Sequence, residues 1–214
     1  MKRISRVHFI AGFSQERNPA ENVLSILQGG ANWIQLRIKG KELPEMKKWA
    51  KIAVDLCRKF KATVIINDYV EIAKEVDADG VHLGKYDTSP LVAREIMGQH
   101  KIIGYTINTH EDIRPEIIEV VDYAGVGPYK ETSTKRTEIS PHGIEGICAL
   151  AVKIRQIRDL PVIAIGGITP GDIPVILKNG IYGIALSSFV IEGDCVAVRT
   201  SLVLKKVYEI AGEI

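Results

Sequence analysis

Short runs of β-branched and aliphatic residues recur along the whole chain, and segments with a helical pattern separate them. Near-continuous apolar runs of this length are typical of parallel strands that are covered on both faces. A chain that alternates such runs with helices belongs to the α/β class. We predict strands at residues 7–12, 33–38, 63–67, 80–84, 101–106, 123–128, 161–167 and 183–188.

The segments between these runs repeat apolar residues at spacings of three and four, which is the period of an amphipathic helix. Residues 143–158 and 196–211 share the pattern, and it is clearest in residues 42–60, at Met46, Trp49, Ile52, Ala53 and Leu56. Eight strand–helix units in 214 residues predict a compact (β/α)8 TIM barrel, a single domain over residues 1–214. A doubly wound open sheet is the alternative, but no GxGxxG follows the first predicted strand.

Two carboxylates follow two successive strands of the predicted barrel. Asn67 and Asp68 come at the end of the third strand, and Asp87 lies three residues beyond Gly84, the end of the fourth. Barrels of this class place their chemistry at the carboxyl ends of the strands, and neighbouring parallel strands lie about 4.8 Å apart. The two carboxylates are therefore expected to converge on one hard cation, although two loop aspartates in ordinary turns are the alternative.

Polar and apolar residues alternate at the end of the second predicted strand. Gln35, Arg37 and Lys39 share one face, and the aliphatic residues between them share the other. Two cations and an amide at the barrel mouth would cost desolvation energy without an anionic partner. The alternation favours an anion site, and the alternative is a strand that runs into a solvated basic turn, which Lys41 would extend.

The later strand ends carry hydroxyls and glycines. Thr106 ends the fifth strand, where a hydroxyl can contact a ligand or close a turn. The connection at residues 127–140 is long for a barrel and could wrap a phosphate with Thr132, Ser133, Thr134 and Lys135. Loops after the seventh and eighth strands of this fold often bind phosphate through backbone N–H groups, as expected for Gly166, Gly167, Ser187 and Ser188. Tight turns and a surface loop without a ligand are the alternatives.

His82 lies inside the fourth predicted strand, and we interpret it as a packed, hydrogen-bonded core histidine.

The overall composition, with 46% hydrophobic and 25% charged residues, is that of a globular protein. A net charge of +2 predicts no nucleic-acid or membrane partner selected by bulk charge. No apolar run approaches the roughly 20 residues that span a bilayer, and the N-terminal apolar run is too short for a signal peptide.

The three cysteines are far apart and form no CxxC pair: Cys57, Cys148 and Cys195. This predicts reduced thiols and a cytoplasmic protein. The sequence leaves open whether the chain forms a homo-oligomer.

Five segments, in their order and spacing, resemble the thiamine phosphate synthase (thiamine-phosphate pyrophosphorylase) family over nearly the whole chain. They read QLRIK, INDYVEIA, ADGVHLGKYD, DYAGVGPYKETSTK and PVIAIGGI. The resemblance implies a (β/α)8 barrel enzyme of thiamine biosynthesis that uses Mg²⁺. It would join 4-amino-2-methyl-5-(diphosphooxymethyl)pyrimidine to hydroxyethylthiazole phosphate and release diphosphate. Whether the thiazole is the ordinary substrate or its carboxylated tautomer is left open.

The resemblance also implies roles for the residues at matching positions. Gln35 would hydrogen-bond the aminopyrimidine, and Asp68 and Asp87 would hold the Mg²⁺. The diphosphate would be held by Arg37, Lys39, Asn67 and Lys135. Thr106 stands where the family usually has a serine near the pyrimidine and the diphosphate. The thiazole phosphate would be received by Thr132, Thr134 and the backbone at Gly167, Ser187 and Ser188.

The implied chemistry is dissociative: the diphosphate leaves first, and the thiazole nitrogen then attacks the pyrimidine methylene cation. Such a reaction needs neutralised leaving-group charge and a closely held nucleophile, rather than a nucleophile from the protein. The implied cations Arg37, Lys39 and Lys135, together with Mg²⁺, outweigh the charge of the two aspartates.

The chain departs from the family pattern at four places. Ile38 replaces a usual glutamate, Lys85-Tyr86 replaces Gln-Glu, residues 129–131 replace an apolar–aromatic–proline run, and Ser187 replaces an apolar residue. Two rival functions remain. A related thiazole tautomerase would use a histidine where this chain has Asn108, and a catalytically silent barrel would only bind thiamine phosphates.

Overall fold

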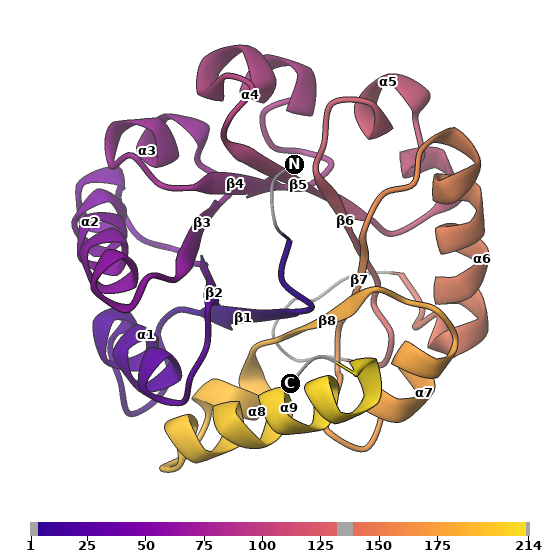
Figure 1. The fold of residues 1–214 in the computed structure, drawn as a ribbon. Coiled ribbons are helices and arrows are strands. Elements are labelled where there is room, and N and C mark those ends of the chain that lie inside the picture. Colours follow the sequence, from indigo (N-terminus) through magenta and orange to yellow (C-terminus); the bar gives the residue numbers. More distant parts are fainter. Residues whose placement is uncertain (1–3, 132–138, 213–214) are drawn as a thin grey trace.

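The computed structural model describes residues 4–131 and 139–212. Eight parallel strands form a closed barrel in which each strand pairs with the next and β8 pairs with β1. Figure 1 shows this ring of strands with the helices around its outside. The strands are β1 (Val7–Ala11), β2 (Trp33–Leu36), β3 (Thr63–Asn67), β4 (Gly80–Leu83), β5 (Ile102–Ile107), β6 (Tyr123–Val126), β7 (Val162–Ile165) and β8 (Gly183–Leu186). The predicted (β/α)8 barrel is confirmed, and the open sheet is excluded.

The helices connect successive strands on the outside of the barrel. They are α1 (Pro19–Gln28), α2 (Leu43–Phe60), α3 (Val70–Glu75), α4 (Pro90–Met97), the 3₁₀ helix η1 (His110–Asp112), α5 (Pro115–Ile118), α6 (Gly143–Ile157), α7 (Ile173–Lys178), α8 (Ser188–Ile191) and α9 (Val196–Ala211). The three segments with the clearest helical period become α2, α6 and α9 within one residue at each end.

Local signals in the sequence explain several of these boundaries. At the start of α1, the side chain of Asn18 accepts hydrogen bonds from the N–H groups of Ala20 and Glu21, and Glu21 accepts one from Asn18 in return. This capping box satisfies backbone donors that have no partner within the helix. Strand β6 ends at Val126, two residues earlier than predicted, because Pro128 has no N–H to continue the ladder.

Two apolar clusters account for the near-continuous apolar runs. One lies between the barrel and its helices and includes Ile34, Leu36 and Ile38 of the β2 segment. The other fills the barrel interior with alternate residues of the strands, among them Ile10, Trp33, Ile65, Tyr123 and Ile163. Each strand therefore buries both of its faces. Polar side chains lie in the barrel above this interior cluster, toward the carboxyl ends of the strands, and they form the candidate site.

Candidate active site

A pocket opens at the carboxyl ends of the strands, above the interior cluster. Its wall is polar along β2 to β5, where it is formed by Gln35, Arg37, Asn67, His82, Thr106 and Asn108. The wall contributed by β1, β7, β8 and the segments after them is mostly apolar, with Ile10, Ile165, Ile168, Ala185, Leu186 and Phe189. The pocket therefore suits a ligand with one polar, charged part and one less polar part.

Gln35 and Arg37 both enter this pocket because side chains alternate along β2. Gln35 is almost fully buried, and its Nε2 donates a hydrogen bond of 2.8 Å to Oδ1 of Asn67 on β3. This bond fixes both amides: Gln35 keeps its oxygen as an acceptor, and Asn67 keeps its Nδ2 as a donor. The two side chains are preorganised for a ligand that offers one donor and one acceptor.

The guanidinium of Arg37 forms no hydrogen bond with another residue in the described part of the chain, whereas its backbone N–H donates to the carbonyl of Ala11 at 2.7 Å. Burial lowers the pKa of its guanidinium, and the carboxylate of Asp68 opposes that effect. A half-buried guanidinium without hydrogen-bond partners has five N–H donors to offer to an anion. This is the arrangement expected of a residue that binds phosphate or carboxylate.

Lys39 and Asp68 form an ion pair between the ends of β2 and β3. Asp68 follows β3 directly, and its backbone adopts φ = 69°, a left-handed conformation that aspartate tolerates better than most residues. Its N–H donates to the carbonyl of His82 at 2.8 Å, which holds the turn against β4. About half of the Lys39 side chain is exposed, so the ammonium group can also reach a ligand at the mouth.

The structure brings the two predicted metal ligands together. Asp87 accepts a hydrogen bond of 2.7 Å from the N–H of Gly84, which turns its carboxyl group back toward the strand ends. Burial raises the pKa of Asp87, and the adjoining carboxyl group of Asp68 raises it further. Two carboxyl groups held this closely repel each other unless a proton or a cation lies between them.

This pair of carboxylates fits a magnesium ion. Mg²⁺ binds to one or two carboxylates and completes its coordination with water and substrate phosphate. The described residues contain no group of three or more His, Cys, Asp or Glu side chains that could hold a metal. Asp68 and Asp87, next to Arg37 and Lys39, therefore match a cation that is shared with a bound phosphate group.

Thr106 lies on the pocket wall and accepts or donates a hydrogen bond of 2.9 Å with Nε2 of His82. The Nδ1 of His82 is 2.9 Å from the hydroxyl of Tyr123 in the barrel interior. His82 is 7% exposed, so the expectation of a buried, hydrogen-bonded histidine is correct. That interpretation did not include the hydrogen bond between His82 and Thr106. This contact depends on the register between strands β4 and β5.

Gly167, Ser187 and Ser188 line the opposite wall of the pocket, next to Gly166. The hydroxyl of Ser187 donates to the carbonyl of Ile10 at 3.2 Å, so this side chain is used within the protein. At Gly167, with φ = 64°, an added Cβ would lie 2.5 Å from the carbonyl oxygen of Glu131. The glycine thus allows a close approach of the protein's own chain, in addition to any approach of a ligand.

Residues 128–131, at the start of the long connection after β6, are held against the loop after β7. The N–H groups of Tyr129 and Lys130 donate to the carbonyls of Ile165 and Gly166. Lys130 also forms an ion pair of 2.5 Å with Asp172. The departure from the family pattern at these positions therefore supplies a buried Tyr129 and a salt bridge.

Three further residues that depart from the family pattern, Ile38, Lys85 and Tyr86, do not line the pocket. Ile38 is buried on the helix side of the barrel, Tyr86 is 95% exposed, and Lys85 lies 3.2 Å from Asp112. Three residues with implied roles, Thr132, Thr134 and Lys135, lie outside the described residues together with Ser133, and their roles stay predictions.

Asn108 and the apolar wall are pocket features that the sequence did not identify as such. Nδ2 of Asn108 donates to the carbonyl of Gly127 at 2.5 Å, and the backbone carbonyl oxygen of Asn108 is 2.7 Å from Nε2 of His142. The apolar residues of the pocket are of the same types as those of the core. They differ from core residues only in lying nearer the carboxyl ends of the strands.

A (β/α)8 barrel whose mouth joins cations, two facing carboxylates and a half-apolar pocket defines a class of enzyme that acts on a phosphorylated small molecule. The chain belongs to the thiamine monophosphate synthase family, whose model matches residues 7–190.

Individual relatives agree with this family. The thiamine-phosphate synthase of Bacteroides thetaiotaomicron is 40% identical over 185 residues, which cover 86% of this chain and 88% of the relative. That of Phocaeicola vulgatus is 38% identical over 200 residues, 92% of this chain and 96% of the relative. The solved thiamine phosphate pyrophosphorylase from Pyrococcus furiosus superposes with a TM-score of 0.81 at 31% identity and covers 96% of both chains. In the part of the chain that the structure describes, none of the helices has the length and apolar character to span a bilayer.

Proposed function

We propose that this chain synthesises thiamine phosphate. It transfers the aminopyrimidinylmethyl group of 4-amino-2-methyl-5-(diphosphooxymethyl)pyrimidine to the ring nitrogen of hydroxyethylthiazole phosphate and releases diphosphate. The observation that carries the proposal is the cluster of Arg37, Lys39, Asp68 and Asp87 at one side of the pocket mouth. A diphosphate with its counter-ion is the ligand that this combination of cations and carboxylates suits. The named activity of the relatives supports the same reaction.

The polar wall of the pocket suits the pyrimidine substrate. The free oxygen of Gln35 accepts a hydrogen bond from the exocyclic amino group, because its own amide nitrogen is already used by Asn67. The remaining donor of Asn67 and the guanidinium of Arg37 then face the diphosphate, and Lys39 approaches it from the rim. Each of these groups is placed by its strand rather than by the ligand.

The residues Asp68 and Asp87 would hold the Mg²⁺. When bound, this ion neutralises charge on the diphosphate and so makes it a better leaving group. Lys39 lies beside Asp68 and contributes a second positive charge at the same edge of the mouth.

The reaction requires positioning more than acid–base chemistry. The bond between the methylene carbon and the bridging oxygen breaks, and its electron pair leaves with the diphosphate. The lone pair of the thiazole nitrogen then forms the new bond to carbon. Ile165, Ile168 and Phe189 provide an apolar wall that keeps water from the methylene cation, and Arg37 and Lys39 stabilise the departing charge.

The two rival functions have weaker support. A tautomerase needs a side chain after β5 that moves a proton, and Asn108 in that position is engaged with the carbonyl of Gly127. A silent barrel that binds thiamine monophosphates would have no use for two facing carboxylates beside two cations.

The experiment that tests the proposal supplies both substrates with Mg²⁺ and measures thiamine phosphate and diphosphate. Ordinary thiazole phosphate and its carboxylated tautomer are supplied in parallel, so the same assay identifies the preferred thiazole. Asp87→Ala is expected to reduce the single-turnover rate by about 10²-fold, comparable with the loss of one transition-state contact. Asp159→Ala, at an exposed position, is the matched control and keeps full activity.

A binding measurement separates the proposal from the silent barrel. Calorimetry with diphosphate and Mg²⁺ is expected to show binding that Asp87→Ala weakens. Product binding without turnover of either thiazole would contradict the proposed reaction, and isomerisation of the thiazole without release of diphosphate would identify a tautomerase.

A further inference from the structure

We propose that Tyr123 and His82 are positioning residues that orient the hydroxyl of Thr106 so that it donates a hydrogen bond to the leaving diphosphate. This inference rests on the proposed function, because it concerns the same pocket and the same substrate. It states in which direction each hydrogen bond is donated along a chain of polar side chains that runs from the barrel interior to the pocket wall.

The three side chains form a continuous chain of hydrogen bonds. The hydroxyl of Tyr123 is 2.9 Å from Nδ1 of His82, and Nε2 of His82 is 2.9 Å from Oγ1 of Thr106. The rings of Tyr123 and His82 are stacked, with centroids 5.4 Å apart and an interplanar angle of 27°. Tyr123 is 1% exposed, whereas Thr106 lines the pocket, so the chain connects a dry interior to the ligand site.

Strand register explains how Tyr123 on β6 reaches His82 on β4 across the intervening strand. His82 lies opposite Gly104 on β5, and Gly104 lies opposite Tyr123. A Cβ on Gly104 would lie 2.1 Å from Cζ of Tyr123 and 2.4 Å from its hydroxyl oxygen. Only glycine at this position therefore lets the phenol ring lie across β5.

A second strand glycine makes room for the imidazole. A Cβ on Gly125 of β6 would lie 3.1 Å from Cε1 of His82. Glycine weakens the interior of a strand and often marks a place where another group approaches closely. Two such glycines on neighbouring strands, each next to one ring of the same pair, indicate that the barrel interior is built around the Tyr123–His82 contact.

The proton positions along this chain follow from the interior end. Burial raises the pKa of Tyr123, so its hydroxyl keeps its proton. Within the described residues, the one hydrogen-bond partner of that hydroxyl is Nδ1 of His82. If Tyr123 donates to Nδ1, the proton of the imidazole is on Nε2, which then donates to Thr106. The reverse tautomer leaves the Tyr123 proton without an acceptor in an apolar interior, which disfavours it by about tenfold or more.

The neighbouring histidine does not disturb this arrangement. His8 packs edge-on against Tyr123 with ring centroids 4.8 Å apart, and its Nε2 is 2.9 Å from the carbonyl of Ser5. Burial, followed by the proximity of His82, lowers the pKa of His8 to about 3, so His8 is neutral. The interior end of the chain therefore holds a neutral ring.

The tautomer of His82 determines the direction of the Thr106 hydroxyl proton. Once Nε2 donates to its oxygen, the Thr106 proton has to point elsewhere, and the pocket is the open side. The hydroxyl then presents a donor to the diphosphate, where negative charge grows as the bond to carbon breaks. With the opposite tautomer, the hydroxyl would give its proton to His82 and present lone pairs to the departing anion, which would repel it.

The tautomer is tested first, in the wild-type protein without substrate. ¹⁵N NMR of the imidazole rings, with His82 assigned by comparison with His82→Gln, is expected to show a protonated Nε2 and an unprotonated Nδ1. A protonated Nδ1 would overturn the proposal. Because this readout does not involve turnover, it decides the proton direction even if the wild-type protein proves inactive, a result that would overturn the proposed function instead.

Coupling between the residues is tested by kinetics. Thr106→Val is expected to lower the single-turnover rate by about 10²-fold, and Tyr123→Phe by about tenfold, with little change in KM for the thiazole phosphate. In the Thr106→Val background, Tyr123→Phe should have no further effect, because it acts only through the Thr106 hydroxyl. Thr106→Ser should restore most of the activity, and additive losses in the double variant would contradict the proposal.

A matched tyrosine serves as the control. The hydroxyl of Tyr182 donates to the carbonyl of Ile4 at 2.6 Å, and Tyr182 does not line the pocket. Tyr182→Phe also loses one hydrogen bond from a tyrosine hydroxyl, and it is expected to keep the wild-type rate. An equal loss of rate in Tyr182→Phe and Tyr123→Phe would show that the effect is structural and would overturn the positioning role.

Discussion

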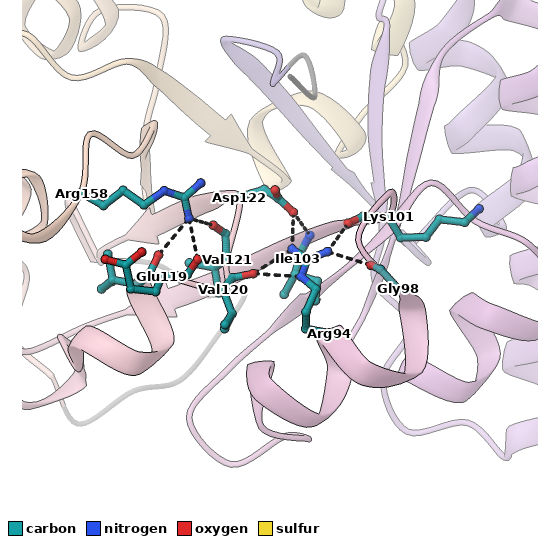
Figure 2. Close-up of polar contacts among 10 residues, drawn as sticks. Arg94, Gly98, Lys101, Ile103, Glu119, Val120, Val121, Asp122 and Arg158 are labelled. Atoms are coloured by element: carbon teal, nitrogen blue, oxygen red, sulfur yellow. Dashed lines mark hydrogen bonds and ion pairs between the residues drawn. The ribbon is translucent and has the colours of Figure 1, made fainter.

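Arginines at the two ends of the barrel show how differently the same residue type can be used. Arg94 on α4 is buried near the amino ends of β5 and β6, where Figure 2 shows it surrounded by backbone carbonyls and Asp122. Its Nε, Nη1 and Nη2 donate to the carbonyls of Gly98, Lys101 and Val120 and to the Asp122 carboxylate at 2.6–3.1 Å. The guanidinium of Arg37 at the mouth has no hydrogen bond to another described residue.

A second arginine completes the arrangement at the base. Nη1 of Arg158 is within 3.2 Å of the carbonyl oxygens of Ile118, Glu119 and Val121, which lie at and just after the end of α5 (Figure 2). Carbonyls at the end of a helix have no partner within it, and a cation there satisfies them. The base arginines therefore hold loops in place, whereas Arg37 keeps its donors for a ligand. A cleft lies beside Arg94 and Arg158, but the donors of Arg94 are already used within the protein.

The largest effect on stability is expected from Arg94→Met. This change leaves several carbonyls and the partly buried Asp122 without their cation, which should cost about 3–5 kcal/mol in the free energy of unfolding. Urea unfolding measures the loss, and the rate per folded molecule should be unchanged. Arg155→Met is the control, because the Arg155 side chain is exposed and donates one hydrogen bond among the described residues, to Gly180, so it should cost about 1 kcal/mol or less. Equal costs for the two variants would remove the structural role of Arg94.

Arg37→Met should show the opposite behaviour. We expect the rate of the chemical step to fall by about 10²–10³-fold, or roughly 3–4 kcal/mol, because the leaving diphosphate loses a cationic contact. The free energy of unfolding should change little, since the guanidinium of Arg37 forms no hydrogen bond with other described residues. Single-turnover kinetics and urea unfolding of the same preparation measure both quantities. An Arg37→Met variant that is unstable but fully active would show that Arg37 has a structural role and does not bind the ligand.

These two arginines also mark how far the sequence can predict the molecule. Alternation along β2 placed Arg37 on the mouth side of its strand without any structure, and strand order brought Asp68 and Asp87 to the same rim. The carbonyls around Arg94 come from two connections, one between α4 and β5 and one between α5 and β6, and no local pattern in the sequence indicates where they meet. Sequence therefore predicts a site built from strand ends better than one built from loop backbones.

His82 shows the same limit within a strand. Its burial follows from the strand pattern, but its role depends on facing Gly104 and, beyond it, Tyr123. The hydrophobic pattern of one strand indicates which face a residue occupies, but which residues lie opposite each other also depends on the neighbouring strands and their connections. The two interior glycines of β5 and β6 are the signal that was present in the sequence, because glycine in a buried strand has to be explained by a close approach.

Acid should unfold the protein partly by protonating Asp112 and Asp172, which hold loops at the mouth. Burial would raise the pKa of each, but hydrogen bonds outweigh it: Asp112 accepts from the N–H groups of Asn108 and Thr109, and Asp172 is paired with Lys130. The folded-state pKa of both therefore lies below the ordinary value of about 3.9. Their stabilisation is present above that value and is lost as the pH falls below it toward the folded pKa.

Chemical unfolding as a function of pH measures this loss. Asp112→Asn and Asp172→Asn should each lower stability at pH 7 and flatten its decline below about pH 4, because one linked proton is removed. The rim carboxylate Asp87 provides the contrast, since its pKa is raised rather than lowered. Replacing Asp87 by asparagine should therefore not destabilise the protein at neutral pH. A decline below pH 4 that is unchanged in both loop variants would contradict this interpretation.

The smallest effect is expected from Lys130→Ala, which removes the ion pair between the start of the β6–α6 connection and Asp172. Half of the Lys130 side chain is exposed, and ion pairs of this kind contribute about 0–1 kcal/mol. Asp172 keeps its hydrogen bonds from the N–H and hydroxyl of Thr169, so its loop should stay folded. Lys47→Ala, which removes an exposed pair with Glu75 on the outer helices, is the control. Comparable stability but a slower turnover in Lys130→Ala alone would show that this salt bridge serves the mouth, whereas a loss of several kcal/mol would place it with the structural contacts of the base.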